Sequence, residues 1–275
     1  MTTSDPEDRA SWPLWTAPVA VLLGLILGSV GTIVVDLVGN AFGSSLSNPS
    51  PATNIAADVV FDLGFVVTAL VLASVRGRPR LAQLGYRRVA PSLAIGSFVI
   101  AAIAYYGLSA VYQSLFALNG SDKLPSDLGV THSTAALIGA AAFVCAIAPI
   151  AEELFFRGFL FGTLRELPIR IGSLDLGPWI AAVLVGILFG AAHLGSAPAE
   201  YLIPLGFLGF VLCLLRWRTG SLYPCMALHS ANNALALGVV TLHWAAGPIV
   251  GLIVASWLTI AAVTGPLASR RPRLA

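Results

Sequence analysis

Six polar side chains interrupt long apolar stretches of this chain and are its strongest candidates for chemistry. They are Glu152, Glu153, Arg157, His193, His229 and Asn233. Carboxylates and imidazoles can move protons, and an amide can donate a hydrogen bond to a developing negative charge. Polar groups inside apolar segments are costly and are functional candidates by default. The set therefore contains the groups that general acid–base chemistry requires.

Two adjacent glutamates and an arginine form the first cluster. Glu153 precedes Arg157 by four residues, the favourable order for an ion pair along a helix. Glu152 is rotated by about 100° from Glu153 and gains no partner from its own helix. We therefore expect Glu153 and Arg157 to support the structure and a desolvated Glu152 to act as a base. The alternative is that the cluster marks a polar helix end.

The remaining candidates lie in two later segments. One has the pattern Phe189-x-x-x-His193, and the other has His229-x-x-x-Asn233. Because His229 and Asn233 are four residues apart, both project from one face of a helix. Taken alone, each pattern is also typical of polar side chains that join packed helices.

The elements that carry these residues are expected to be hydrophobic helices. Of 275 residues, 57% are hydrophobic and 10% are charged, whereas soluble domains average about 25% charged residues. We expect an all-α polytopic membrane protein that forms a single membrane domain over residues 1–275. The net charge of +2 does not suggest a nucleic-acid partner. Cys145, Cys213 and Cys225 form no C-x-x-C pair and are expected to be structural thiols.

Eight apolar segments are candidates for transmembrane helices. Their expected bounds are Ala17–Val38, Ile55–Val75, Ser92–Leu118, Ser133–Leu164, Pro178–Leu194, Tyr201–Leu215, Leu222–Val240 and Ala246–Ala268. At about 1.5 Å per residue, the candidate side chains on the fourth, fifth and seventh helices fall at overlapping depths. We therefore expect a polar cavity between these three helices.

The basic residues predict the orientation of the helices. With eight spans, all but one of the loop and terminal basic residues fall on one side of the membrane: Arg9, Arg76, Arg78, Arg80, Arg87, Arg88, Arg165, Arg170, Arg216, Arg218, Arg270, Arg271 and Arg273. The opposite side receives Lys123. Positive residues collect on the cytoplasmic side. We therefore expect both termini to be cytoplasmic and the protein to lie in the cell membrane.

The ordered motifs resemble those of a known family. Glu152-Glu153-x-x-x-Arg157, Phe189-x-x-x-His193 and His229-x-x-x-Asn233 are similar to the motifs of the CAAX protease and bacteriocin-processing (CPBP) family, which includes the type 2 CAAX prenyl endopeptidases. The segment Arg218-Thr219-Gly220-Ser221-Leu222 also resembles the family's usual lead-in to the last motif. The resemblance covers roughly residues 133–240, which would form a protease core.

The resemblance implies an eight-helix intramembrane endopeptidase whose cavity opens to the cytoplasm. It implies that Glu152 and His193 activate a water molecule and that His229 and Asn233 form an oxyanion hole. The substrate would be a membrane-associated or lipidated peptide or protein, and the other contacts would be with membrane lipid.

The family has also been labelled a metalloprotease family, so zinc is an alternative. Glu152, His193 and His229 could hold a catalytic zinc ion with one open position. The chain contains no H-E-x-x-H motif, and Asn233 is better suited to donating a hydrogen bond to an oxyanion. We therefore favour a metal-independent reaction without a cofactor.

Two other classes of protein fit parts of the pattern. A transporter could use Asp58, Asp62, Glu152 and the histidines as a proton relay, but it would show inverted repeats that this chain lacks. Asp58 and Asp62 are instead expected to be solvated at the outer rim. An inactive family member could retain the fold as a scaffold.

Overall fold

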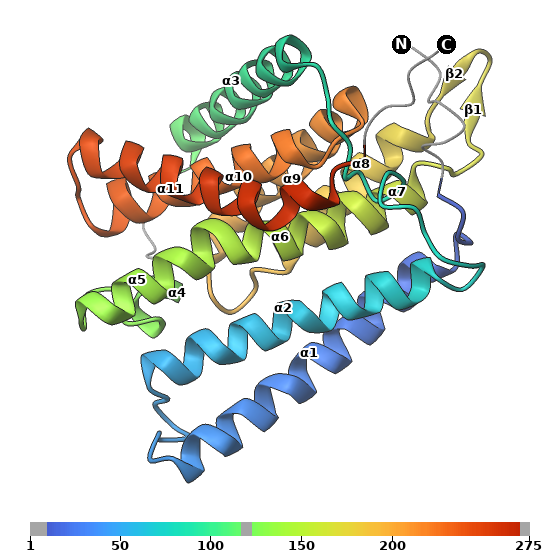
Figure 1. Ribbon diagram of the computed structural model, residues 1–275. Helices are drawn as coiled ribbons and strands as arrows, with labels where there is room; N and C mark the ends of the chain where they lie inside the picture. The colour runs from blue at the N-terminus through green and yellow to red at the C-terminus, as the bar shows by residue number, and fades with distance from the viewer. Residues whose placement is uncertain (1–9, 117–122, 270–275) are drawn as a thin grey trace.

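The computed structural model describes residues 10–116 and 123–269, and it is built almost entirely of helices (Figure 1). The main helices are α1 (Thr16–Ala41), α2 (Pro51–Ala73), α3 (Pro91–Leu115), the short α4 (Leu124–Asp127), α8 (Gly177–Ala191), α9 (Ala199–Thr219), α10 (Tyr223–Leu235) and α11 (Ala246–Thr264). A small hairpin pairs β1 (Arg170–Ile171) with β2 (Leu174–Asp175). The expected all-α architecture is confirmed.

A single long rod occupies residues 134–164 and alternates between two helical forms. Its α-helical parts are α5 (Thr134–Ala142), α6 (Ala148–Glu153) and α7 (Phe161–Leu164), and π-helical turns span Phe143–Ile147 and Leu154–Leu160. Another π-helical turn, Ala236–Thr241, extends α10, and a 3₁₀ turn, Gly265–Leu267, extends α11. Such π-turns often occur at functional sites.

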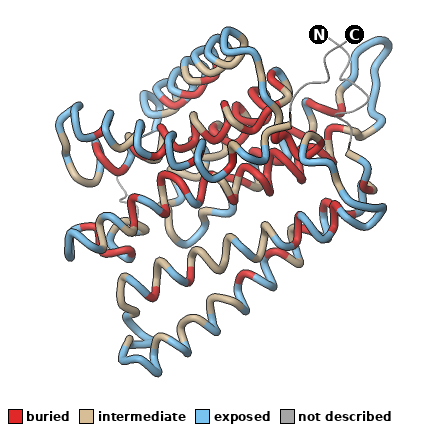
Figure 2. Tube along the Cα trace, in the orientation of Figure 1, coloured by how far each residue is buried: buried red, intermediate tan, exposed pale blue. Residues whose placement is uncertain are grey.

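Six of the described helices are long and apolar enough to cross a membrane: α1, α2, α3, the rod 134–164, α9 and the 246–267 helix. The fifth expected span is shorter than predicted, because α8 ends at Ala191 and has 15 residues, about 22 Å of helix. The exposed surfaces of α1 and α3 are apolar, as expected for helices that face lipid, whereas burial concentrates in the central helices (Figure 2).

Hydrogen bonds join the arginine-rich loop after α2 to several other segments at one end of the bundle. Leu222 N–H donates to Gly85 O at 2.9 Å, and Ser221 Oγ donates to Arg87 O at 2.7 Å. Ser269 Oγ donates to Tyr86 O at 3.0 Å. This end, which also holds α7 and the β hairpin (Figure 1), is called the arginine-rich end below.

The opposite end is closed by a different set of loops. Asn54 Nδ2 donates to Asp127 O at 2.7 Å, which ties the start of α2 to α4. Lys123 N–H donates to Ser196 O at 3.1 Å, which ties the start of α4 to the loop between α8 and α9. The structure thus places Lys123 at the end opposite the arginines, as the eight-helix order predicts.

Close packing of α8 against α9 fixes the position of the loop between them. A side chain at Gly190 would come within 2.5 Å of Leu202 O, and one at Gly186 within 2.9 Å of Gly206 O. Small residues let helices approach closely in membranes. This approach holds the end of α8, where His193 follows, beside the start of α9.

Candidate active site

A cavity of about 720 Å³ lies between α2, α3, the rod 134–164, the loop after α8, the start of α9 and the end of α10. Its walls include Glu152, His193 and Asn233. His229 lies behind Glu152, with Nε2 3.9 Å from Glu152 Oε2. Three of the four candidate catalytic residues therefore line one cavity, and the fourth, His229, lies behind Glu152. The cavity is broader than expected because α2 and α3 also line it.

Glu153 and Arg157 form the expected ion pair. Arg157 Nη1 lies 2.8 Å from Glu153 Oε1, and neither side chain is exposed. The guanidinium also donates to Gly209 O on α9 at 3.3 Å and lies 4.3 Å from the centre of the Phe189 ring. The pair therefore connects the rod 134–164 to α8 and α9, which is a supporting role.

The structure adds a partner for Glu153 that sequence reasoning missed. His229 Nδ1 lies 2.9 Å from the same Glu153 oxygen that accepts from Arg157. A carboxylate accepts hydrogen bonds, so Nδ1 carries the proton. His229 Nε2 is then directed toward Glu152. The two adjacent glutamates therefore contact opposite nitrogens of one imidazole.

Glu152 differs from Glu153 in its surroundings. Its side chain is 21% exposed, and it lines the cavity. Its Oε2 atom is buried and has no hydrogen-bond partner. Glu152 therefore borders the cavity with a partly exposed side chain, and its Oε2 atom lies toward His229 Nε2, 3.9 Å away.

His193 lies outside the helix in which it was expected. α8 ends at Ala191, and the chain then turns through Gly195, whose positive φ of 102° ends helical continuation. His193 Nδ1 lies 2.8 Å from Phe189 O. A carbonyl oxygen can only accept a hydrogen bond, so Nδ1 is the donor. In a neutral ring, Nε2 is then free to accept a hydrogen bond.

Phe189 explains why an aromatic residue precedes this histidine. Its ring is fully buried and lies 5.1 Å from the His193 ring and 5.5 Å from the His229 ring, centre to centre. The same ring contacts Arg157. Phe189 therefore packs between the two histidines and Arg157 and helps to fix their relative positions.

Pro149 shapes the site through the carbonyls that it leaves free. Proline has no N–H, so the carbonyls four and five residues earlier, those of Cys145 and Val144, lose their helical donor. Ser230 Oγ donates to Cys145 O at 2.6 Å, and Asn233 Nδ2 donates to Val144 O at 2.9 Å. Hydrogen bonds therefore join the polar face of α10 to the rod 134–164 where Pro149 interrupts its backbone hydrogen bonds. Asn233 retains a second amide hydrogen that it can donate.

Asp58 and Asp62 were expected to be solvated at the outer rim, and the structure contradicts this for Asp62. Both line the cavity, and Asp62 Oδ2 is buried without a hydrogen-bond partner. The position of a residue along α2 predicts how deep it lies in the membrane. It does not predict which other helices pack around that residue.

The position of the cavity along the bundle follows from its lining residues. Its walls lie in the half of the bundle opposite the arginine-rich end, with residues such as Gln113, Leu124 and Ala197.

The zinc alternative requires Glu152, His193 and His229 to converge on one point. Among residues 10–116 and 123–269, no group of three histidine, cysteine, aspartate or glutamate side chains is placed to hold a metal ion. The hydrogen bond from His229 Nδ1 to Glu153 leaves Nε2 free, so it does not argue for or against a metal ligand. As arranged, Glu152, His193 and His229 do not converge as three zinc ligands.

Comparison with known proteins supports the motif assignment. Residues 134–235 match the family described as type II CAAX prenyl endopeptidase Rce1-like. The matched segment contains every one of the six candidate side chains, from Glu152 to Asn233.

Two curated relatives carry the description uncharacterized. Protein YyaK of Bacillus subtilis is 33% identical over 114 residues, which is 38% of this chain and 34% of that protein. A 24.3 kDa protein of Escherichia coli is 26% identical over 162 residues, which is 56% of this chain and 72% of that protein. The match thus spans about a third of the length of the first relative. No solved structure matches. Residues 134–235 of this chain are therefore similar to the type II CAAX prenyl endopeptidase Rce1-like family, which supports the resemblance found from the motifs.

Proposed function

We propose that this protein is an intramembrane endopeptidase that hydrolyses a peptide bond of a membrane-associated or lipidated peptide or protein. The observation that carries the proposal is the cavity shared by Glu152, His193 and Asn233, with His229 directly behind it. The cavity lies in a chain with six helices able to span a membrane. We place the protein in the cell membrane, in contact with lipid.

In the proposed reaction, Glu152 and His193 activate one water molecule. Glu152 Oε2 has no partner, and the Nε2 atom of His193 can accept a hydrogen bond when Nδ1 donates to Phe189 O. As the water oxygen bonds to the scissile carbonyl carbon, its proton passes to Glu152. Glu152 then returns the proton to the departing amine as the C–N bond breaks.

Asn233 and His229 stabilise the negative charge that develops on the carbonyl oxygen. Asn233 uses one amide hydrogen on Val144 O and can donate the other to the oxyanion. His229 already donates from Nδ1 to Glu153. To donate from Nε2 as well, its ring must carry both protons, and Glu152 and Glu153 flank that cation.

The test compares membranes from cells that produce the wild-type protein or Glu152→Gln. We expect new peptide termini from membrane-associated proteins in the wild-type sample alone, at equal abundance of the two variants. If proteomic analysis finds the same termini in both samples, Glu152-dependent hydrolysis is refuted.

A proton-coupled transporter is the second candidate, because Asp58 and Asp62 join Glu152 in the cavity. A transporter would move protons across sealed vesicles in a manner that Asp58→Asn and Asp62→Asn abolish. A peptidase would show no such proton flux. Proton uptake measured with a pH-sensitive dye in reconstituted vesicles separates the two functions.

A further inference from the structure

Carboxylates from two elements line the cavity. Asp58 and Asp62 lie four residues apart on α2, so both project from the same face of that helix. Both aspartates line the cavity, as does Glu152 on the rod 134–164. The reaction proposed above uses Glu152 and gives the two aspartates no role.

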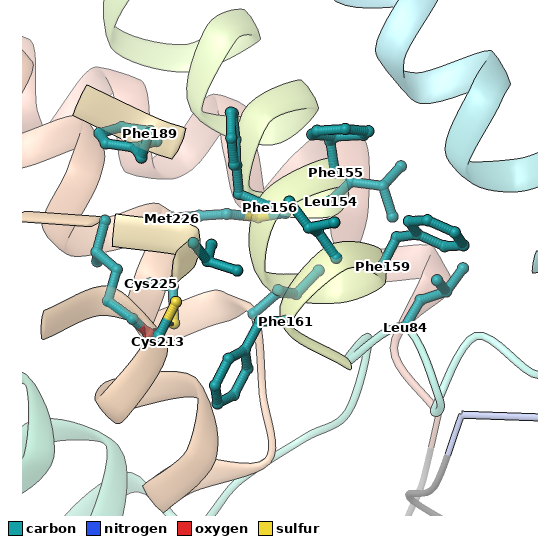
Figure 3. Packing of buried hydrophobic residues seen from close by; sticks show 14 of the residues in the cluster. Leu84, Leu154, Phe155, Phe156, Phe159, Phe161, Phe189, Cys213, Cys225 and Met226 are labelled. Carbon is teal, nitrogen blue, oxygen red and sulfur yellow. Dashed lines mark hydrogen bonds between the residues drawn. The ribbon is translucent and has the colours of Figure 1, made fainter. Parts of the chain in front are cut away.

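A contact between two aromatic rings holds Asp62 near Glu152. Phe65 on α2 and Phe155 on the rod have their ring centres 4.7 Å apart, and each ring follows one of these carboxylates by three residues. Side chains three residues apart lie on one side of a helix, about one turn from each other. Phe155 also belongs to a closely packed hydrophobic cluster (Figure 3), which fixes the rod at this point. Asp62 and Glu152 therefore face the same part of the cavity.

Within the described part of the chain, no lysine or arginine neutralises the two aspartates. Asp62 Oδ2 is buried and has no hydrogen-bond partner. Among residues 10–116 and 123–269, no lysine or arginine lines the cavity, and the nearby guanidinium of Arg157 is paired with Glu153. A buried carboxylate without a partner is unfavourable, and ionisable groups inside membrane helices often mark the place where a substrate binds. This wall is therefore suited to a ligand that brings a positive charge.

We propose that Asp58 and Asp62 bind the positively charged side chain of a lysine or arginine in the substrate, close to the peptide bond that Glu152 hydrolyses. This inference rests on the proposed peptidase function and narrows its substrate class. Most of the other lining residues are apolar. The substrate is therefore an apolar peptide segment that carries a basic residue near its cleavage site.

Two photoreactive peptides that differ in one side chain test this preference. Both are apolar and carry a diazirine leucine, which is followed by lysine in one peptide and by norleucine in the other. The ammonium group is then the difference between them. The full-length protein is reconstituted in zwitterionic lipid, cross-linking is measured against peptide concentration, and mass spectrometry locates the cross-linked residues.

The variant for this test combines Asp58→Asn with Asp62→Asn, which removes both charges with little change in volume. Asp36→Asn is the control, because Asp36 is a carboxylate on α1 that does not line the cavity. The comparison of the two peptides on the wild-type protein does not depend on the folding of either variant.

We expect the lysine peptide to half-saturate cross-linking of the cavity wall at about a tenfold lower concentration than the norleucine peptide, because a hydrogen bond to a charged group changes affinity by about this factor. The control should keep this preference, and the double variant should bind the two peptides alike. Equal affinities of the wild type for the two peptides would overturn the proposal, as would a lysine preference that the double variant retains. Cross-links that avoid the cavity wall with both peptides would refute the cavity as the peptide site.

The binding measurement separates this inference from the proposed function, because binding requires no turnover. A lysine preference in a protein that produces no Glu152-dependent termini would refute the peptidase function and leave the charge preference standing. Glu152-dependent cleavage without a lysine preference would refute this inference alone.

Discussion

His229 and Glu153 are joined by a hydrogen bond of 2.9 Å between Nδ1 and Oε1, although 76 residues separate them in the chain. The same glutamate oxygen accepts from Arg157. One buried carboxylate therefore orients a candidate catalytic imidazole and neutralises a buried guanidinium. The proposed role of Glu152 as a base depends on this arrangement, because Glu152 faces the other nitrogen of His229.

Arg157→Ala should destabilise the protein. It leaves the fully buried Glu153 without its cation, and breaking a buried pair by removing one partner costs about 3–5 kcal/mol. Thermal unfolding in detergent measures the loss. Arg218→Ala is the control, because Arg218 is exposed at the end of α9. Equal unfolding temperatures for the two variants would contradict the supporting role of the pair.

Ser230→Ala should cost more stability when Pro149 is present than when it is replaced. With Pro149, Cys145 O depends on Ser230 for its donor, and a buried group left unsatisfied costs about 1–3 kcal/mol. In a Pro149→Ala background, residue 149 regains an N–H that can serve Cys145 O. A double-mutant cycle of unfolding free energies measures the difference. Identical costs in both backgrounds would show that Ser230 does not compensate for the proline.

Much of this arrangement could be predicted from the sequence, and the part that could not involves contacts between distant segments. The Glu153–Arg157 pair follows from a spacing of four on one helix. The bond between His229 and Glu153 depends on how two helices pack, which no local pattern gives. His193 was misplaced because the apolar run continues past Ala191, whereas the helix ends there.

The same limit explains the cavity walls. Asp58 and Asp62 could be assigned a depth from their position in α2, but their burial depends on α3 and the rod 134–164. Pro149 lies within the rod 134–164. The carbonyls that it frees are bound by Ser230 and Asn233, which are more than 80 residues away, so their shared role becomes visible in the structure alone.

Asn233→Ala should slow hydrolysis strongly and affect substrate binding little. Loss of one oxyanion donor typically lowers the rate by about 10²–10³, because the interaction strengthens in the transition state. Steady-state kinetics separates kcat from KM. Asn232→Ala is the matched control, since Asn232 also lines the cavity but has no proposed catalytic role. Comparable losses of kcat in both variants would remove Asn233 from the oxyanion hole.

Purified protein freed of zinc should retain its activity. The proposed reaction activates water with Glu152 and His193 and uses no metal ion. Elemental analysis beside activity before and after chelation checks this. Stoichiometric zinc, with activity lost on chelation and restored by added zinc, would overturn the metal-independent reaction. Inhibition by excess zinc alone would not contradict it, because an ion that blocks the cavity need not take part in the reaction.

The most direct test of the account is the hydrolysis rate of purified Glu152→Gln in bilayers, with a peptide substrate identified from the membrane comparison. Asp36→Asn is the control, because Asp36 is a carboxylate on α1 that does not line the cavity. We predict that Glu152→Gln unfolds at the wild-type temperature and has no measurable hydrolysis, whereas Asp36→Asn hydrolyses at the wild-type rate. A folded Glu152→Gln that retains most of the wild-type rate would contradict Glu152 as the base.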